Sequence, residues 1–373
     1  MDALTTPSNW QRVRLGDIGK PCMCKRVMKH QTTQYGEIPF YKIGTFGNTA
    51  DAFISKKLFL EYKTKYSFPK KGDILISASG TIGRAVIYDG KPAYFQDSNI
   101  VWIDNDETLV KNDFLFYAYS NIKWNTEHTT ILRLYNDNFR NTLIPLPPLN
   151  EQIAIANILS DVDRYLYNLD ALILKKESVK KALSFELLSQ RKRLKGFNQA
   201  WQRVRLGDIA NYLTSNLSAE QITQQGKIKV YDVNNFIGYT NTTFISDKPY
   251  ISIVKDGSVG RVRILPPKTN ILSTMGALIA NHKTTTEFLF YLLSNFDFKN
   301  FTSGSIIPHI YFKDYKEKTI FLPPLNEQIA IANILSDVDS EIISLKNKKR
   351  QFENIKKALN HDLMSAKIRV LKE

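Results

Sequence analysis

Residues 146–163 read LPPLNEQIAIANILSDVD, and residues 322–339 repeat the same 18 letters at an offset of 176 positions. This period is too long for a solenoid repeat, which spans about 20–50 residues. Each copy therefore belongs to a duplicated half of the chain. A second phrase, WQRVRLGDI, is also repeated, at residues 10–18 and 201–209.

The two phrases frame a domain-sized segment in each half, residues 19–145 and 210–321, and these segments share little sequence. In both, β-prone runs surround a Gly-x-x-Gly-Arg turn, and an apolar helical pattern follows. The predicted elements of the first segment are strands at 36–43, 71–77 and 85–88, a turn at 80–84 and a helix at 111–120. Their fainter counterparts are a strand at 231–233, a turn at 256–261 and a helix at 286–294. We therefore expect one α/β fold with two different surfaces.

The composition indicates a globular protein with a polyanionic partner. The 373 residues suffice for two or three domains with separate cores. The 51 basic and 36 acidic residues give a net charge of +15, which suits nucleic acid, although a lysine-rich proteome would produce the same excess. There is no run of 18 uncharged apolar residues and no signal-peptide pattern. We therefore expect no membrane partner and a cytoplasmic location.

The two cysteines do not predict a metal site. Cys22 and Cys24 form a single C-x-C with His30 nearby, whereas a structural zinc site needs four ligands. Reduced thiols without a metal are expected.

Each proline-rich phrase is followed by a helical pattern. Leu-Pro-Pro-Leu cannot lie inside a helix, because proline lacks the N–H donor and clashes with the preceding turn. Asn150 and Asn326 are predicted N-caps, with Glu151 and Glu327 in the first turn, where the helix dipole favours negative charge. Apolar residues then recur at heptad spacing over about 43 residues, or roughly 65 Å. Two such seams are expected to pair with each other, antiparallel if a pseudo-two-fold axis relates the halves. Three charged residues interrupt them: Lys176, Glu341 and Lys348.

This order of variable domain, constant helix, variable domain and constant helix resembles the specificity subunit of type I restriction–modification systems. The resemblance covers essentially the whole chain and rests on the Pro-Pro-Leu-x-Glu-Gln phrases and the two tryptophan phrases. It implies an α+β fold, with two mixed α/β target-recognition domains joined by two long antiparallel coiled-coil helices in pseudo-two-fold symmetry. The implied recognition domains are residues 1–147 and 196–323, and the implied helices are 148–195 and 324–373.

The resemblance also implies a function. Each recognition domain would read one half of a bipartite double-stranded DNA site, and the helices would set the spacing and dock two methyltransferase subunits. Restriction subunits would join that core, and the chain would hold no catalytic site or cofactor. The expected partner-binding residues are Asn150, Glu151, Gln152, Asn326, Glu327 and Gln328. An orphan DNA-binding protein of the same fold, acting without methyltransferase partners, would share all these features.

Motifs for catalysis by the chain itself are missing from the sequence. The two prolines at 147–148 follow leucine rather than Asn or Asp, and neither a G-x-G-x-x-G loop after a strand nor a P-loop occurs. Residues 61–63 (EYK), with Asp51 upstream, have the E-x-K pattern of nucleases, but the second half has no matching set. Residues 80–83 and 257–260 match the RNA-binding GXXG loop, although tight turns produce the same pattern.

The residues that contact DNA are the least determined part of the prediction. Lys and Arg on phosphates supply affinity, and side chains at base edges supply specificity. The candidates are Lys25, Arg26, Lys29, Ser79, Thr81, Arg84, Arg133 and Tyr135 in the first domain, and Ser258, Arg261, Arg263, His309 and Tyr311 in the second. Arg133 and His309 correspond at the offset of 176, and this change of type suits readers of different half-sites, since Arg pairs bidentately with guanine. All these residues would also fit solvated surface or internal hydrogen bonding. The basic residues between 175 and 195 suit a solvated face, a partner surface or a run beside spacer DNA.

Overall fold

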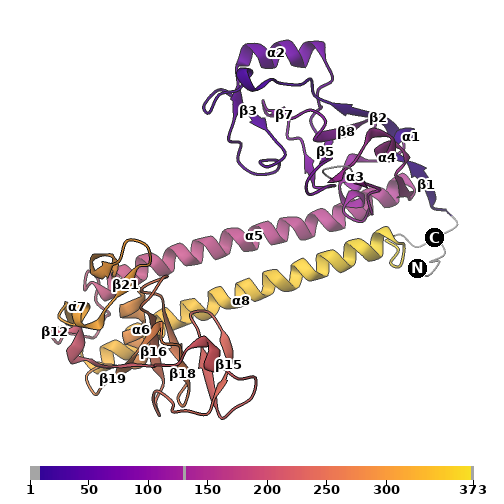
Figure 1. The fold of residues 1–373 in the computed structure, drawn as a ribbon. Coiled ribbons are helices and arrows are strands. Elements are labelled where there is room, and N and C mark those ends of the chain that lie inside the picture. Colours follow the sequence, from indigo (N-terminus) through magenta and orange to yellow (C-terminus); the bar gives the residue numbers. More distant parts are fainter. Residues whose placement is uncertain (1–8, 129–131, 371–373) are drawn as a thin grey trace. The chain divides into compact units, whose positions relative to one another are not determined.

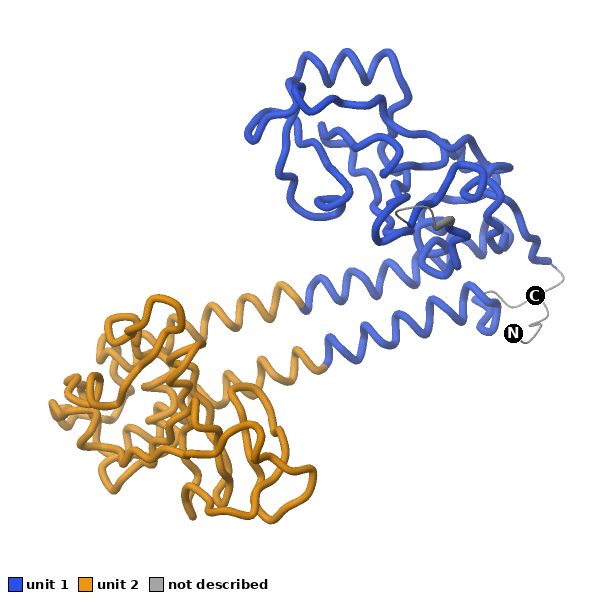
Figure 2. Tube along the Cα trace, in the orientation of Figure 1, with its two compact units in different colours: residues 1–169, 348–373 blue, residues 170–347 orange. Residues whose placement is uncertain are grey.

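The computed structural model describes residues 9–128 and 132–370. The chain forms two compact units (Figure 2). The first unit comprises residues 1–169 and 348–373, and the second comprises residues 170–347. Each unit therefore holds one variable domain, the first half of the long helix that follows it, and the second half of the other long helix.

In the first unit the two repeated phrases meet in an antiparallel ladder, where β1 (Gln11–Arg14) pairs with β11 (Leu143–Leu146). The domain between them has a four-stranded sheet of order β2-β8-β5-β6 and a three-stranded sheet of order β4-β3-β7 (Figure 1). These strands are β2 (Gly19–Met23), β3 (Ile38–Tyr41), β4 (Phe53–Ile54), β5 (Ile74–Ser77), β6 (Ala85–Ile87), β7 (Tyr94–Phe95) and β8 (Ile100–Asn105). Two short strands, β9 (Glu127–His128) and β10 (Leu132–Arg133), pair with each other.

Within its described residues, the first domain has five short helices, of which α3 packs between a sheet and the long helix that follows. They are α1 (Leu15–Ile18), η1 (Lys29–Gln31), α2 (Lys56–Lys65), α3 (Asn112–Tyr119) and α4 (Asn136–Asn141). The predicted helix at 111–120 is α3, which buries Phe114 and Leu115 in one core with Ile76 of the sheet. Ile155, from the first turns of the long helix, belongs to the same core. Burial of these apolar side chains holds the domain and the start of its helix together.

The second unit repeats this arrangement. β12 (Gln202–Arg205) pairs with β22 (Thr319–Leu322), and the two sheets have the orders β13-β19-β16-β17 and β15-β14-β18. These strands are β13 (Ala210–Thr214), β14 (Ile228–Tyr231), β15 (Phe236–Thr240), β16 (Tyr250–Val254), β17 (Val262–Leu265), β18 (Asn270–Ile271) and β19 (Met275–Ala280). The remaining elements are η2 (Leu206–Asp208), η3 (Ala219–Gln221), α6 (Thr286–Ser294), η4 (Lys299–Phe301), β20 (Thr302–Ser303), β21 (His309–Ile310) and α7 (Phe312–Tyr315).

The expectation of one mixed α/β fold used twice is confirmed by the strand orders, which correspond one to one between the units. The domains differ where their lengths differ. The first domain has the 10-residue helix α2 after β4, and among the described residues no helix stands at that place in the second domain.

The long helices are α5 (Leu149–Leu188) and α8 (Leu325–Met364), each 40 residues, or about 60 Å at 1.5 Å per residue. Both begin one residue before the predicted N-caps, so that prediction is wrong. Asn150 and Asn326 lie inside the first turn, where each side-chain oxygen accepts from the backbone N–H of the next residue at 2.9 Å. In α5, the carbonyl of Pro148 instead accepts the early helical hydrogen bonds from Glu151 and Gln152.

Both long helices end in the same way. Gln190 and Ala366, 176 positions apart, have φ values of 60° and 57°. Lys192 N–H bonds to the carbonyl of Glu186, and Ile368 N–H bonds to the carbonyl of Asp362. In α8, Lys367 N–H also bonds to the carbonyl of Asp362 at 2.9 Å. This six-to-one bond beside the left-handed Ala366 is a Schellman end, which usually has glycine at that position. The sequence therefore gave no sign of where the helices stop.

Within each unit, α5 and α8 contact each other through charged and aromatic residues. In the first unit Lys356 pairs with Asp163, and the rings of Tyr165 and Phe352 lie 4.6 Å apart. In the second unit Lys180 pairs with Asp339 at 2.5 Å, and Lys176 pairs with Glu341 at 2.8 Å. The residues that interrupt the predicted seams thus have partners, because Lys176 and Glu341 pair with each other and Lys348 lies 5.6 Å over the Tyr165 ring. No helix within residues 9–128 and 132–370 is long and apolar enough to cross a bilayer.

Candidate functional site

The repeated phrases build the same buried junction in both units. In the first unit the Glu151 carboxylate, 2% exposed, accepts from Trp10 Nε1 at 3.0 Å and from Arg369 Nε and Nη2 at 2.7 and 3.1 Å. In the second unit the fully buried Glu327 accepts from Trp201 Nε1 at 3.0 Å and from Arg193 at 2.7 and 3.2 Å. Each carboxylate is thus paired with a cation and a neutral donor, as a buried charge requires.

The glutamines of the phrases hold the variable domains mainly by their backbone, with one side-chain bond in the second unit from Thr284 Oγ1 to Gln328 Oε1 at 2.8 Å. Gln152 accepts from Lys111 N–H at 2.9 Å and donates to the carbonyls of Leu109 and Pro147. Gln328 makes the equivalent bonds in the second unit, accepting from Thr285 N–H and donating to the carbonyls of Lys283 and Pro323. Both glutamines are fully buried.

This burial corrects the expectation that the whole phrase contacts a partner. Glu151, Gln152, Glu327 and Gln328 are at most 2% exposed, so they act inside their units. Asn150 and Asn326 are exposed, and their role as partner contacts stays a prediction.

A third contact in both units joins the domain helix to the two long helices. Tyr117 of α3 donates to Asp163 at 2.8 Å, and Lys356 both pairs with Asp163 and lies 5.6 Å over the Tyr117 ring. Tyr291, Asp339 and Lys180 repeat this arrangement in the second unit. Burial, together with the hydrogen bond to the neighbouring aspartate, raises the pKa of both tyrosines, so each remains a donor.

A cleft of about 480 Å³ opens on the surface of the first domain. It collects three candidate DNA contacts, Arg26, Lys29 and Arg133, with Lys42 as a fourth cation. The polar residues that line it from the β7–β8 connection are Gln96, Asp97, Ser98 and Asn99. Val27, Phe40 and Ala52 supply apolar lining beside these basic and polar side chains, and the cations suit an anionic, hydrogen-bonding ligand.

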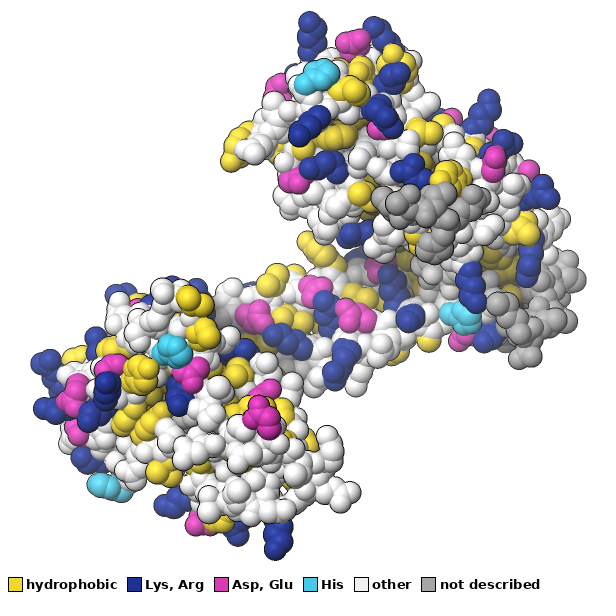
Figure 3. All heavy atoms as spheres, in the orientation of Figure 1, with side chains coloured by type: hydrophobic (Ala, Val, Ile, Leu, Met, Phe, Trp, Pro, Cys, Tyr) yellow, Lys and Arg dark blue, Asp and Glu magenta, His cyan; other side chains and the backbone are white. Residues whose placement is uncertain are grey.

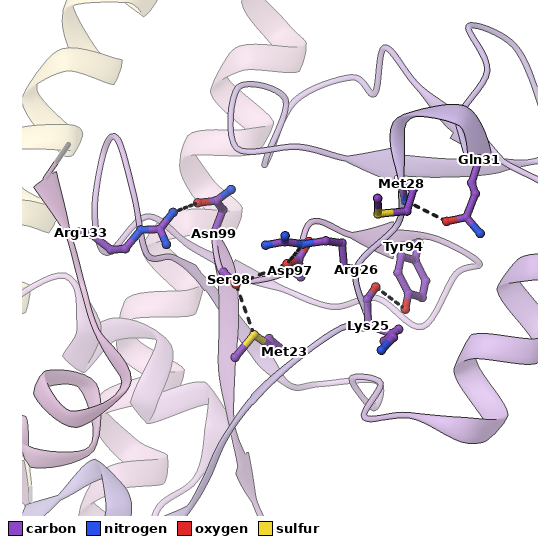
Figure 4. A network of polar contacts seen from close by, with 10 residues as sticks. All are labelled: Met23, Lys25, Arg26, Met28, Gln31, Tyr94, Asp97, Ser98, Asn99 and Arg133. Atoms are coloured by element: carbon purple, nitrogen blue, oxygen red, sulfur yellow. Dashed lines mark hydrogen bonds and ion pairs between the residues drawn. The ribbon is translucent and has the colours of Figure 1, made fainter. Parts of the chain in front are cut away.

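Figure 4 shows how two of these cations are held. Arg26 Nε bonds to Asp97 at 2.8 Å, and Arg133 Nη2 bonds to Asn99 Oδ1 at 3.1 Å. Ser79 Oγ donates to the same Asn99 oxygen at 2.8 Å. Ser98, between the two acceptors, has φ of 60°, a conformation that is costly for residues other than glycine and that concentrates at functional sites.

The other candidate DNA contacts of the first domain do not line the cleft. Thr81 and Arg84 are exposed at the glycine turn, where Arg84 reaches the carbonyl of Gly47 at 3.5 Å. Lys25 is exposed with its Nζ 5.1 Å over the Tyr66 ring. Tyr135 is 38% exposed. Ser79 is buried and acts through Asn99.

The candidates of the second domain form two groups. Asp256 bonds to His309 Nδ1 at 2.7 Å, and the Tyr311 ring stacks on His309. Arg261 Nη2 and Arg263 Nη1 bond to the side-chain oxygen and the carbonyl of Asn234 at 2.8 and 2.9 Å. Ser258 is exposed at the turn. Figure 3 shows that Lys and Arg side chains occur on the visible face of both units, interspersed with acidic ones.

The two Gly-x-x-Gly segments are tight turns. All four of their glycines have positive φ. A Cβ on Gly83 would lie 2.0 Å from Trp124 Nε1, and one on Gly260 would lie 2.7 Å from the Phe298 ring. The second glycine is thus needed for packing inside the domain.

The E-x-K pattern does not form a cluster. Glu61 pairs with Lys65, and Asp51 pairs with Lys42. Within the described parts of the chain, no group of three His, Cys, Asp or Glu side chains is placed to hold a metal ion.

Sequence reasoning missed the residues that hold the candidates in place. Asn99, Asp97 and Asn234 lie in connections without a motif, and only the fold brings them to their partners. Asp256 lies in the predicted turn at 256–261, but nothing in the sequence pairs it with His309. The repeat could have indicated that Arg369 and Arg193 have equivalent roles, because they lie 176 positions apart.

Comparisons with known proteins agree on one family. The family model for the type I restriction modification DNA specificity domain matches residues 7–176 and 198–354. A putative type I restriction enzyme specificity subunit of Haemophilus influenzae is 64% identical over 148 residues, covering 39% of this chain and 38% of that relative. The MjaVIII specificity subunit of Methanocaldococcus jannaschii is 26% identical across 99% of this chain and 95% of its own length. The putative MjaX specificity subunit of that organism is 30% identical across 80% and 79%.

Solved structures show the same fold. The crystal structure of a type I restriction–modification S subunit from M. genitalium matches with a TM-score of 0.63 at 20% identity, covering 97% of both chains. A chain from a study of assembly and conformational transition in a type I system matches with a TM-score of 0.58 at 16% identity, covering 96% of this chain and 98% of that one.

Proposed function

The chain belongs to the family of type I restriction–modification DNA specificity domains, and from this premise we propose that each of its variable domains reads one half of a bipartite duplex DNA site. One observation carries the proposal. The two domains share their strand orders, yet at one equivalent place the first has Arg133 bonded to Asn99 and the second has His309 bonded to Asp256. A constant scaffold with different side chains at one position is the arrangement that two readers of different half-sites need.

The candidate residues divide into two roles. Arg133 reads a base edge, because its guanidinium can pair bidentately with guanine. His309, stacked by Tyr311, is its counterpart in the second domain. The remaining cations, Lys25, Arg26, Lys29, Arg84, Arg261 and Arg263, contact phosphates and supply affinity that depends on salt. Thr81 and Ser258 lie on the same glycine turns as Arg84 and Arg261, Ser79 bonds to the acceptor of Arg133, and Tyr135 is partly exposed two residues after Arg133. Their hydroxyls position the duplex or the readers.

The long helices set the distance between the half-sites as an antiparallel coiled coil with pseudo-two-fold symmetry. This arrangement is supported by equivalent contacts in the two units at an offset of 176 positions. Glu151 and Arg369 correspond to Glu327 and Arg193, and Asp163 and Lys356 correspond to Asp339 and Lys180. In each pair of contacts the carboxylate moves from α5 to α8 and its cation makes the reverse exchange, which is the pattern that a two-fold arrangement would produce.

Two like apolar patches are the docking sites for two methyltransferase subunits. Leu149 and Ile153 lie one turn apart on α5 and are 40% and 46% exposed. Leu325 and Ile329 lie equivalently on α8 and are 45% and 49% exposed, and exposed Asn150 or Asn326 accompanies each pair. Paired exposed apolar side chains mark protein interaction sites. Restriction subunits join the complex through the docked subunits, in the cytoplasm, where DNA is accessible.

A domain exchange tests the recognition model. The variable domain of the first unit is replaced with that of a relative, and the methylated sequence is read from the DNA of cells that carry the complex. One half of the sequence is expected to change while the other half and the spacing stay the same. A change in both halves, or in neither, would refute separate reading.

Co-purification separates this role from that of an orphan DNA-binding protein. Methyltransferase subunits are expected to co-purify with the chain, and Leu149→Ser with Ile153→Ser should release one of two copies. The equivalent pair Leu325→Ser with Ile329→Ser should release the other. If no methyltransferase subunit binds at micromolar concentration, the chain acts without such partners.

A further inference from the structure

In both units the candidate base reader lies on the same small backbone frame. Ser79 and Arg133 form an isolated antiparallel bridge in the first unit, as do Asp256 and His309 in the second. Next to this bridge, Ala78 N–H bonds to the carbonyl of Asn99 at 2.7 Å, and Lys255 N–H bonds to that of Thr274 at 3.1 Å. Three backbone positions thus correspond between the units, namely 79 with 256, 99 with 274, and 133 with 309.

In the first unit the side chain at position 99 fixes the reader. Asn99 Oδ1 accepts from Ser79 Oγ at 2.8 Å and from Arg133 Nη2 at 3.1 Å. An arginine side chain samples many rotamers when free, so this acceptor restricts the directions that the guanidinium can take. Among the residues that the structure describes, this bond engages one terminal nitrogen of Arg133, and a guanidinium has five N–H donors. A guanidinium held in this way can present its other donors to a base edge.

In the second unit the anchor comes from a different position of the frame. Asp256, at the place of Ser79, holds His309 Nδ1 at 2.7 Å. A contact at Nδ1 fixes the ring and leaves Nε2 as the nitrogen available to a ligand. Thr274, at the place of Asn99, is exposed, and Tyr311 stacks on the imidazole instead.

We propose that Asn99 and Asp256 are positioning residues for DNA-base recognition, each orienting the reader of its own half-site. The inference rests on the proposed function and adds residues that do not themselves read a base. In this arrangement specificity depends on the anchor and the reader together, not on position 133 or 309 alone. An arginine needs an acceptor that leaves its other donors free for the base, and a histidine needs an acceptor that selects one ring nitrogen.

The test uses the full chain, with any methyltransferase subunits that co-purify. It is incubated with duplex DNA in which both half-sites are randomised, and the bound duplexes are sequenced. Asn99→Ala is expected to lower base preference in one half-site about tenfold, the effect of losing a hydrogen bond to a charged group, and to leave the other half-site unchanged. Asp256→Ala, which removes the acceptor for His309 Nδ1, is expected to lower preference in the other half-site only.

Two further variants separate positioning from general stability. Thr274→Ala changes the frame position that corresponds to Asn99 without removing an anchor, and it should leave both preferences unchanged. Asn99→Asp keeps an acceptor for Arg133 and Ser79 and should retain the preferred base, although its negative charge weakens binding to all duplexes alike.

The outcomes distinguish this inference from the proposed function. If the unaltered chain selects two half-sites but Asn99→Ala and Asp256→Ala leave their preferences intact, the positioning role is overturned. Equal losses in both half-sites, or a loss with Thr274→Ala as large as that with Asn99→Ala, would also overturn it. If the unaltered chain selects no sequence, the proposed function fails, and this inference fails with it.

Discussion

The buried junction allows one prediction to be worked out from the structure. Arg193→Met keeps an apolar stem but removes the cation that pairs with Glu327. Removing one partner of a buried ion pair costs about 3–5 kcal/mol. Two features reduce this cost, since Trp201 still donates to Glu327 and the Arg193 side chain is 26% exposed. We expect the second unit to lose about 2–3 kcal/mol of unfolding free energy, or roughly 4–12 °C in Tm for a domain of this size.

The assay must resolve the two units, so hydrogen exchange of the full chain with peptide resolution suits it better than a single melting curve. Protection should fall across residues 170–347 and remain in the first unit. Arg369→Met is the matched variant, because it removes the equivalent cation from Glu151 and should reverse the pattern.

A double variant identifies the cause of the loss. Arg193→Met with Glu327→Gln replaces the unpaired carboxylate with a neutral amide that still accepts from Trp201, and it should recover more than half of the lost stability. A double variant as unstable as the single one would refute the account, because the loss would then come from packing and not from an unpaired charge. A change below about 0.5 kcal/mol for Arg193→Met would refute it as well.

Three further predictions concern single features. Arg26→Ala and Lys29→Ala should each reduce the slope of log affinity against log salt by about 0.9 if each contacts one phosphate, with base preference unchanged in the sequencing assay. Gly83→Ala should cost about 2 kcal/mol or more in chemical denaturation, because φ is 82° and Trp124 lies 2.0 Å from the new Cβ. Gly72→Ala, at φ of 94° in open space, should show the backbone strain alone. Burial raises the pKa of Cys22 and raises that of Cys24 to about 12. Since a raised thiol pKa leaves little thiolate at pH 8, iodoacetamide should alkylate both cysteines far more slowly in the folded chain than in denaturant, and equal rates would contradict this.

Much of the fold could be predicted because the repeats carry local signals. The proline phrases, the apolar pattern of α3 and α6, and the glycine turns all act over a few residues, and the structure places each where the sequence indicated. The helix ends could not be predicted, because Gln190 and Ala366 adopt a left-handed conformation that their residue types do not suggest.

The candidate site was predicted less completely because its geometry depends on contacts that are distant in sequence. Arg133 could be singled out by its offset from His309, but its acceptor Asn99 lies 34 positions away in a connection without a motif. The phrase Asn-Glu-Gln suggested a partner surface because it is polar and repeated. The fold instead buries Glu151 and Gln152, where they bind Trp10, Arg369 and backbone atoms.

The proline phrases can stay constant while the variable domains differ, because of the atoms that Gln152 and Gln328 contact. Gln152 binds its variable domain through backbone groups of Leu109 and Lys111, and Gln328 binds through those of Lys283 and Thr285. Backbone groups are the same whatever side chains the domain carries, so the constant phrase can hold domains of different sequence. The tryptophan that the junction requires lies within a repeated phrase, and the paired arginine, Arg369 or Arg193, lies just after the end of a long helix, outside the variable domains. In the second unit one variable-domain side chain also takes part, because Thr284 Oγ1 donates to Gln328 at 2.8 Å. An exchanged domain should therefore seat correctly if its boundaries fall between the tryptophan phrase and the proline phrase. An exchange whose boundary falls inside WQRVRLGDI would disrupt the pairing of β1 with β11 and leave the buried glutamate without its tryptophan donor.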